Sequence, residues 1–120
     1  MSKYKILILE DDDNRIVYFR RNLYGHDVIV TKFSKEAIGL LKKFKFDVLF
    51  LDHDLGGKQM VAPGENTGSE VAEWLNAHPD RQPPSINIHS YNPDGAKNMH
   101  RLLPGSILCP GVWLTDMSAR

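Results

Sequence analysis

An uninterrupted apolar run, Val48 to Leu51, constrains the fold of this chain more than any other stretch of its sequence. A strand with one face in water alternates apolar and polar side chains, whereas a run without polar residues is typical of a parallel strand covered on both faces. Asp52, His53 and Asp54 follow the run directly and lead into a glycine-rich loop. Because ligands bind at the C-terminal ends of strands in open α/β sheets, this stretch predicts both a central strand and the position of a site.

The rest of the chain alternates short apolar strands with segments of helical spacing. We expect strands at 4–9, 27–31, 46–51, 85–89 and 106–109, and helices at 14–23, 34–44, 69–77 and 93–103. Right-handed crossovers then give a doubly wound parallel five-stranded sheet, for which the flavodoxin-like order 2-1-3-4-5 is the simplest solution. The remaining residues, 112–120, are too few for a full helix, so the last helix is expected to be missing or truncated.

Polar residues mark where three of these helices should begin. Asp13 or Asn14 can cap the first helix, and Ser34 can cap the second. Thr67 to Glu70 has the capping-box pattern and predicts the start of the third.

Composition sets the broad class of the protein. The 120 residues make one domain, 1–120, and the 15 acidic and 15 basic residues argue against a strongly basic nucleic-acid binder. Cys109 is the sole cysteine, which excludes an intrachain disulfide framework and fits a reducing compartment. No segment approaches transmembrane length, so we expect a cytoplasmic protein without a membrane partner.

Charged and polar side chains follow three of the expected strands. Glu10 to Asp13 are four consecutive acids after the first strand, and they indicate either a solvated helix start or a divalent-cation site. His89 and Ser90 end the fourth strand. The predicted strand order places Glu10 and Asp11 beside Asp52, with His89 at the end of the neighbouring strand.

Three motifs, ILILEDDDNR, FDVLFLDHDLGG and INIHSYN, resemble the receiver domain of response regulators (CheY-like proteins). The resemblance implies that Glu10 and Asp11 bind Mg²⁺, with Mn²⁺ as the alternative ion. It implies that Asp52 is the phosphoacceptor and a further metal ligand, and that Ser90 is the Ser/Thr that contacts the phosphate. Receivers use a backbone carbonyl at the position of Asp54, so its carboxylate is expected to ligate the metal, orient a histidine or cap the loop.

The sequence also departs from the receiver pattern. Cys109-Pro110 stands where receivers have Lys-Pro, and that lysine pairs with the acyl phosphate. Leu55 opens an insertion, and the helix expected after the last strand is absent or short. The pairs His53-Asp54 and His89-Ser90 resemble a receiver-like branch proposed to process cyclic phosphates.

The two histidines have two interpretations. Adjacent parallel strands lie about 4.8 Å apart, so His53 and His89 can flank one ligand, and imidazole can serve as acid or base near neutrality. Side chains alternate along the chain, however, so His53 can also point away from Asp52 and Asp54 and support the loop.

Two functions follow from these patterns. The first is a metal-dependent phosphoesterase that acts on a phosphate-containing small molecule or an RNA end with a cyclic phosphate, with His53, His89 and Asp52 as catalytic residues. The alternative is a divergent receiver or pseudo-receiver in phosphorelay signalling, with Asp52 phosphorylated by a histidine kinase. Either protein can form a homodimer through the face that lacks the fifth helix.

Overall fold

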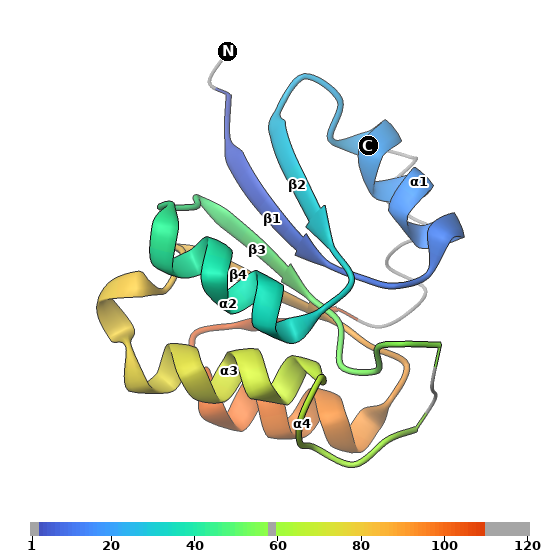
Figure 1. The fold of residues 1–120 in the computed structure, drawn as a ribbon, viewed down its shortest axis with the longest axis vertical. Helices are drawn as coiled ribbons and strands as arrows, with labels where there is room; N and C mark the ends of the chain where they lie inside the picture. Colours follow the sequence, from blue (N-terminus) through green and yellow to red (C-terminus); the bar gives the residue numbers. More distant parts are fainter. Residues whose placement is uncertain (1–2, 58–59, 110–120) are drawn as a thin grey trace.

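The computed structural model describes residues 3–57 and 60–109 (Figure 1). Within these residues a parallel sheet has the order β2-β1-β3-β4-β5, which confirms the predicted flavodoxin-like fold. The strands are β1 (Lys5–Leu9), β2 (Asp27–Thr31), β3 (Val48–Leu51), β4 (Ser85–His89) and β5 (Ile107–Cys109). The helices are α1 (Asp13–Asn22), α2 (Ser34–Lys43), α3 (Gly68–Ala77), α4 (Pro93–Leu102) and the 3₁₀ helix η1 (Pro79–Arg81). The prediction of a missing or truncated last helix concerns residues 110–120, outside the described residues.

The sheet separates two apolar cores. Figure 1 shows α2, α3 and α4 side by side, and their core contains Leu9, Leu51 and Ile88. The other core contains Ile8 and Phe50, which pack against α1. Side chains alternate between these faces along each strand, and the residue directly after each strand continues the alternation. Its side chain therefore lies on a predictable side of the sheet.

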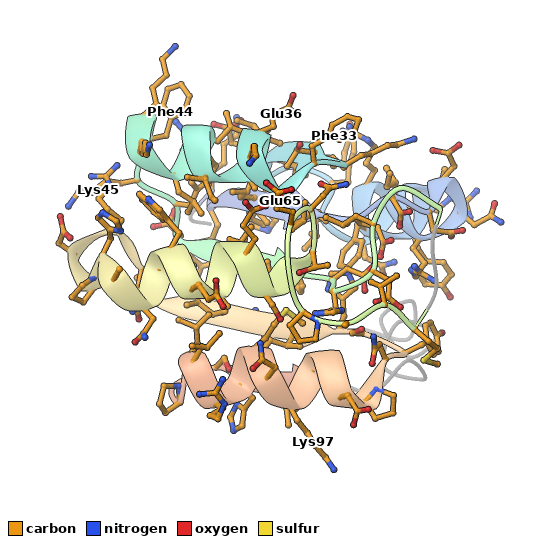
Figure 2. All side chains as sticks on the ribbon, turned by 60° about the horizontal axis from the view of Figure 1, so that its bottom comes forward. Phe33, Glu36, Phe44, Lys45, Glu65 and Lys97 are labelled. Atoms are coloured by element: carbon orange, nitrogen blue, oxygen red, sulfur yellow. The ribbon has the colours of Figure 1, made fainter. Side chains whose placement is uncertain are left out.

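The outer faces of the helices are polar, as amphipathic helices require. Glu36 on α2 and Lys97 on α4 are exposed and point away from the sheet (Figure 2). Among the described helices none is both long and apolar enough to cross a membrane.

The starts of α1 and α2 differ from the prediction. α1 is capped by Asp12, whose carboxylate accepts the backbone N–H of Arg15 at 2.9 Å, one residue earlier than expected. Ser34 is the first residue of α2 rather than its cap, and Phe33 holds the cap position without a side-chain bond. The N–H of Ser34 instead donates to the side-chain oxygen of Asn66, so a distant loop satisfies this helix end.

The predicted capping box before α3 is also wrong. Thr67 occupies the N-cap position, but its hydroxyl bonds to the backbone of Gly64 and makes no cap bond. The Glu70 carboxylate accepts the N–H of Asn66 at 3.0 Å and the hydroxyl of Ser34. These side chains tie the end of the 55–66 loop to α2, which a local capping pattern does not reveal.

Candidate functional site

Glu10 is the most heavily bonded carboxylate of the site. It follows β1, is fully buried, and accepts the backbone N–H groups of Asp11 and Asp12 at 3.0 Å each. Arg15 donates two N–H groups to it at 2.7 and 2.9 Å, and His89 Nε2 lies 3.0 Å from Oε1. Burial by itself raises the pKa of Glu10, but the bonds from His89 and Arg15 outweigh it and lower the pKa to about 2. Glu10 is therefore ionised at neutral pH.

Asp52 has the opposite electrostatic environment. It follows β3, is only 4% exposed, and accepts the N–H of His53 at 2.9 Å. Its other oxygen lies 3.6 Å from Arg15 Nη2. Burial and the negative charge of Glu10 raise the pKa of Asp52 to about 9, because Arg15 offsets them only in part. Without a bound metal ion, Asp52 therefore holds a proton at neutral pH.

Glu10, Asp11 and Asp52 form the acidic cluster of the site, with one oxygen from each within 4.8 Å of the others. Hard divalent cations bind carboxylate oxygens, so the donor set is suitable for such an ion. The raised pKa of Asp52 gives a second reason, because a cation would offset both causes of the shift, the burial of the carboxylate and its repulsion by Glu10. The residues therefore fit a divalent cation, as the sequence indicated for these three positions.

A cavity of about 680 Å³ opens over the acidic cluster. Its described lining consists of acids, one guanidinium and a few uncharged side chains: Asp11, Asp12, Asp13, Asn14, Arg15, Asp52, Asp54, Gly57, Met60 and Tyr91. The volume lies within the range of small-molecule sites. The lining combines two members of the acidic cluster, Asp11 and Asp52, with a guanidinium suited to an anion.

Asp54 lines this cavity but belongs to another hydrogen-bond network. One oxygen accepts the N–H of Met60 at 2.7 Å. The other accepts the amide of Asn92 at 3.0 Å and lies 2.9 Å from His53 Nδ1. Burial raises the pKa of Asp54, but the bonds from Asn92, His53 and Met60 together lower it. Asp54 is not among the three clustered carboxylates, and its role as a metal ligand stays a prediction.

His53 packs against α4 and does not line the described cavity. Its ring is fully buried, and a Cβ on Gly95 would lie 2.3 Å from its Cγ, so glycine provides the space for the imidazole. Leu51 and His53 share one face of the sheet, whereas Phe50 and Asp52 share the other. His53 thus points away from Asp52 and supports Asp54 under the loop.

His89 lies on the other side of the sheet. Its ring is buried edge-on against Phe19 of α1 at 5.0 Å between centroids, and its Nδ1 has no hydrogen-bond partner among the described residues. Like His53, it is not part of the described cavity lining. The expectation that the two imidazoles flank one ligand does not hold in this structure, because strand alternation sends them to opposite faces.

Ser90 and Cys109 occupy the ends of neighbouring strands. The Ser90 hydroxyl accepts the N–H of Asn92 at 3.1 Å and is not among the described lining residues, so its contact with phosphate stays a prediction. Cys109 is buried at the end of β5, where the receiver pattern has a lysine. The charge of that lysine is therefore missing from the described site.

Two residues of the site were missed by sequence reasoning. Arg15 bridges Glu10 and Asp52. Its position in the first turn of a helix that follows an acidic strand end is the sequence feature that could have indicated this role. Asn92 directly precedes the helix expected at 93–103. Its oxygen does cap α4 through the N–H of Gly95, but its amide also donates to Asp54 and to the carbonyl of Val61.

Comparisons with known proteins give the family and the fold of this chain. Residues 6–105 match the model of the family described as the cyclic-phosphate processing receiver domain. No curated protein matches the sequence.

Solved structures of response regulators share the fold. The Mn²⁺-bound form of response regulator Rcp1 is 16% identical, with a TM-score of 0.73 over 97% of this chain and 90% of that one. The phosphorylated cyanobacterial phytochrome response regulator RcpA is 19% identical, with a TM-score of 0.75 over 97% and 86%. A putative response regulator from Chloroflexus aurantiacus J-10-fl is 17% identical, with a TM-score of 0.75 over 99% and 94%.

Proposed function

Because the chain belongs to the family of cyclic-phosphate processing receiver domains, we propose that it is a metal-dependent phosphoesterase that opens a cyclic phosphodiester. The observation that supports this most directly is the acidic cluster of Glu10, Asp11 and Asp52 beneath a cavity that Arg15 also lines. Together these groups can bind a cation and a phosphate side by side. The Mn²⁺ in the Rcp1 structure is consistent with Mg²⁺ or Mn²⁺ as the ion.

The cation would be held by Glu10, Asp11 and Asp52. When bound, it supplies positive charge against phosphate oxygens and makes water more acidic. Arg15 supplies the second positive charge, which compensates for the lysine that Cys109 replaces. Its planar guanidinium matches phosphate geometry, and it is free to bind phosphate once a cation shares the carboxylates that it now pairs with.

Asp54 is the carboxylate that we assign to the attacking water. A carboxylate has about four acceptor positions. Among the described residues, Met60, Asn92 and His53 occupy three of them, which leaves one for a water molecule from the cavity that Asp54 lines. Its lowered pKa keeps it ionised at neutral pH, so that its oxygen can accept a hydrogen bond from this water and orient it. Water then adds to phosphorus, one P–O bond of the ring breaks, and the leaving oxygen takes up a proton.

His53 and His89 act in this proposal as positioning residues. His89 fixes Glu10 for the cation, and His53 fixes Asp54 for the water. His89→Leu should therefore weaken Mg²⁺ binding while leaving the rate at saturating Mg²⁺ nearly unchanged. His53→Leu should lower kcat even at saturating Mg²⁺, and a purely structural role would change neither quantity selectively.

The proposal is tested with 2′,3′-cyclic AMP and MgCl₂, followed by separation of the products. We expect the wild type to form adenosine monophosphate with Mg²⁺ and not with EDTA. Asp52→Asn and Asp54→Asn should each lose about a hundredfold or more in rate. Asp13→Asn is the matched control, because Asp13 lines the cavity but, within residues 3–57 and 60–109, pairs only with Lys32 at the surface. Its rate should stay within a few-fold of the wild type.

Two outcomes would contradict the proposal. The first is turnover that persists in EDTA or in Asp52→Asn. The second is a wild type that opens no cyclic phosphate but is labelled on Asp52 by acetyl phosphate, since that result indicates a phosphorylated receiver.

A further inference from the structure

The cavity has a rim that a bare phosphate would not use. Its floor is formed by carboxylates and Arg15, whereas Tyr91 and Met60 contribute the large uncharged side chains of the described lining. Both are more than half exposed, Tyr91 at 58% and Met60 at 65%. A volume of about 680 Å³ exceeds the needs of a cation and one phosphate group and suits a ligand with an additional ring system.

From this arrangement we infer that Tyr91 is a stacking platform for a nucleobase, so that the cyclic phosphate processed here is that of a ribonucleoside. The inference rests on the proposed function, because it takes the phosphate to bind at Arg15 and the acidic cluster. A phosphate on a ribose at this floor places the attached base at the rim, where Tyr91 stands.

Arg15 connects the two parts of the site. Its guanidinium carbon lies 5.4 Å from the centroid of the Tyr91 ring, within the range of a cation–π contact. The same guanidinium bonds to Glu10 and approaches Asp52. The tyrosine ring therefore lies next to the phosphate-binding charges, on a residue that is 58% exposed.

Hydrogen bonds of Ser90 and Asn92 hold the backbone on either side of Tyr91. The preceding Ser90 accepts the N–H of Asn92 through its hydroxyl at 3.1 Å. Asn92 is buried, caps α4 through Gly95 and donates to Asp54 at 3.0 Å. An exposed aromatic side chain on such a fixed turn loses little conformational freedom when a ligand stacks on it, which favours binding.

Packing in the core does not explain why a tyrosine stands at position 91. A tyrosine that serves the core is mostly buried, whereas this residue is more than half exposed and lies beside a charged cavity. Asn14 on the same rim has an amide with both donors and acceptors, as a base edge requires. Stacking on an aromatic ring tolerates any base, so we expect little discrimination between purines and pyrimidines.

The experiment measures affinities by calorimetry in MgCl₂ for three proteins that all carry Asp54→Asn to prevent turnover. One retains Tyr91, and the other two also carry Tyr91→Phe or Tyr91→Leu. The ligands are 2′,3′-cyclic AMP, 2′,3′-cyclic UMP and the base-free glycerol 1,2-cyclic phosphate. We expect the nucleotides to bind about tenfold or more tightly than the base-free ligand. Tyr91→Phe should keep this difference and Tyr91→Leu should remove it, while the base-free affinity stays constant.

The outcomes separate this inference from the proposed function. Equal affinities for nucleotide and base-free ligands, or a difference that survives Tyr91→Leu, overturn the platform alone. No Mg²⁺-dependent binding of any cyclic phosphate overturns both. A short oligoribonucleotide with a 2′,3′-cyclic end distinguishes the source of the ligand: tighter binding than the mononucleotide indicates an RNA end, and equal or weaker binding indicates a free nucleotide.

Discussion

Replacing Gly95 with alanine tests how His53 is held. A Cβ at Gly95 would lie 2.3, 2.5 and 2.7 Å from Cγ, Nδ1 and Cδ2 of the imidazole, whereas ordinary contacts begin at 3.4 Å. The ring would have to shift by about 1 Å, although it is fully buried and its Nδ1 lies 2.9 Å from Asp54. The substitution therefore overpacks this part of the core and strains the bond that orients Asp54.

The expected loss of stability combines two destabilising effects with one stabilising effect. Overpacking a core costs about 1–3 kcal/mol, and a strained hydrogen bond adds about 1 kcal/mol. Alanine in place of a helical glycine stabilises the helix by about 1 kcal/mol. We expect a net loss near 2 kcal/mol, or a Tm lowered by about 8 °C for a domain of this size. Gly39→Ala is the control, because Gly39 also lies inside a helix but nothing comes within 4 Å of its Cβ position, and it should raise the Tm slightly.

A double-mutant cycle identifies the cause. In a His53→Ala background the obstructing ring is gone, so Gly95→Ala should cost little or become stabilising. Chemical denaturation of the four proteins gives the coupling energy. If Gly95→Ala behaves like Gly39→Ala, or if its cost is the same with and without His53, then the buried position of His53 against α4 is wrong.

Three other side chains of the site have measurable effects. Arg15→Met should bind Mg²⁺ at least several-fold more tightly, because it removes a competing cation, and phosphate more weakly; a weaker Mg²⁺ affinity in calorimetry would refute this. Asn92→Ser should keep the α4 cap, worth about 1 kcal/mol relative to Asn92→Ala, but both should be cleaved faster by protease in the 55–66 loop. Asp52 has a folded pKa of about 9 against 3.8, so metal-free stability should fall as pH rises from about 4 to 9, and Asp52→Asn should abolish this slope in urea titrations.

The sequence predicts the sheet and the edge at which the site lies. Apolar runs and their spacing define the strands, and the parallel topology brings Glu10, Asp11 and Asp52 together as expected. These predictions succeed because they depend on periodicity and on a strand order with few alternatives.

The orientation of the histidines depends on residues far away in the chain. His53 turns toward α4 because Gly95, 42 residues later, leaves room for it, and no local pattern marks that glycine as its partner. Arg15 was expected as an ordinary helix residue, yet it supplies the charge that pairs with both buried carboxylates. Such pairings are set by tertiary contacts, which single-sequence patterns do not contain.

The opposite pKa shifts of Glu10 and Asp52 have a consequence for metal binding. Both carboxylates are buried, but Glu10 receives donors from Arg15 and His89 and has a pKa of about 2, whereas Asp52 has a pKa of about 9. Asp52 must therefore lose its proton before it can ligate a cation, while Glu10 has none to lose.

We accordingly expect Mg²⁺ binding at pH 7 to release close to one proton. The apparent affinity should rise about tenfold per pH unit below the pKa of Asp52 and level off as the pH approaches it. Calorimetry in two buffers with different ionisation enthalpies measures the number of protons, and Asp52→Asn should reduce it to zero. An affinity that is constant between pH 6 and 8, without proton release, would mean that Asp52 is already ionised. Glu10 and Asp52 would then share the single positive charge of Arg15, and the site would still have excess negative charge for a cation to balance.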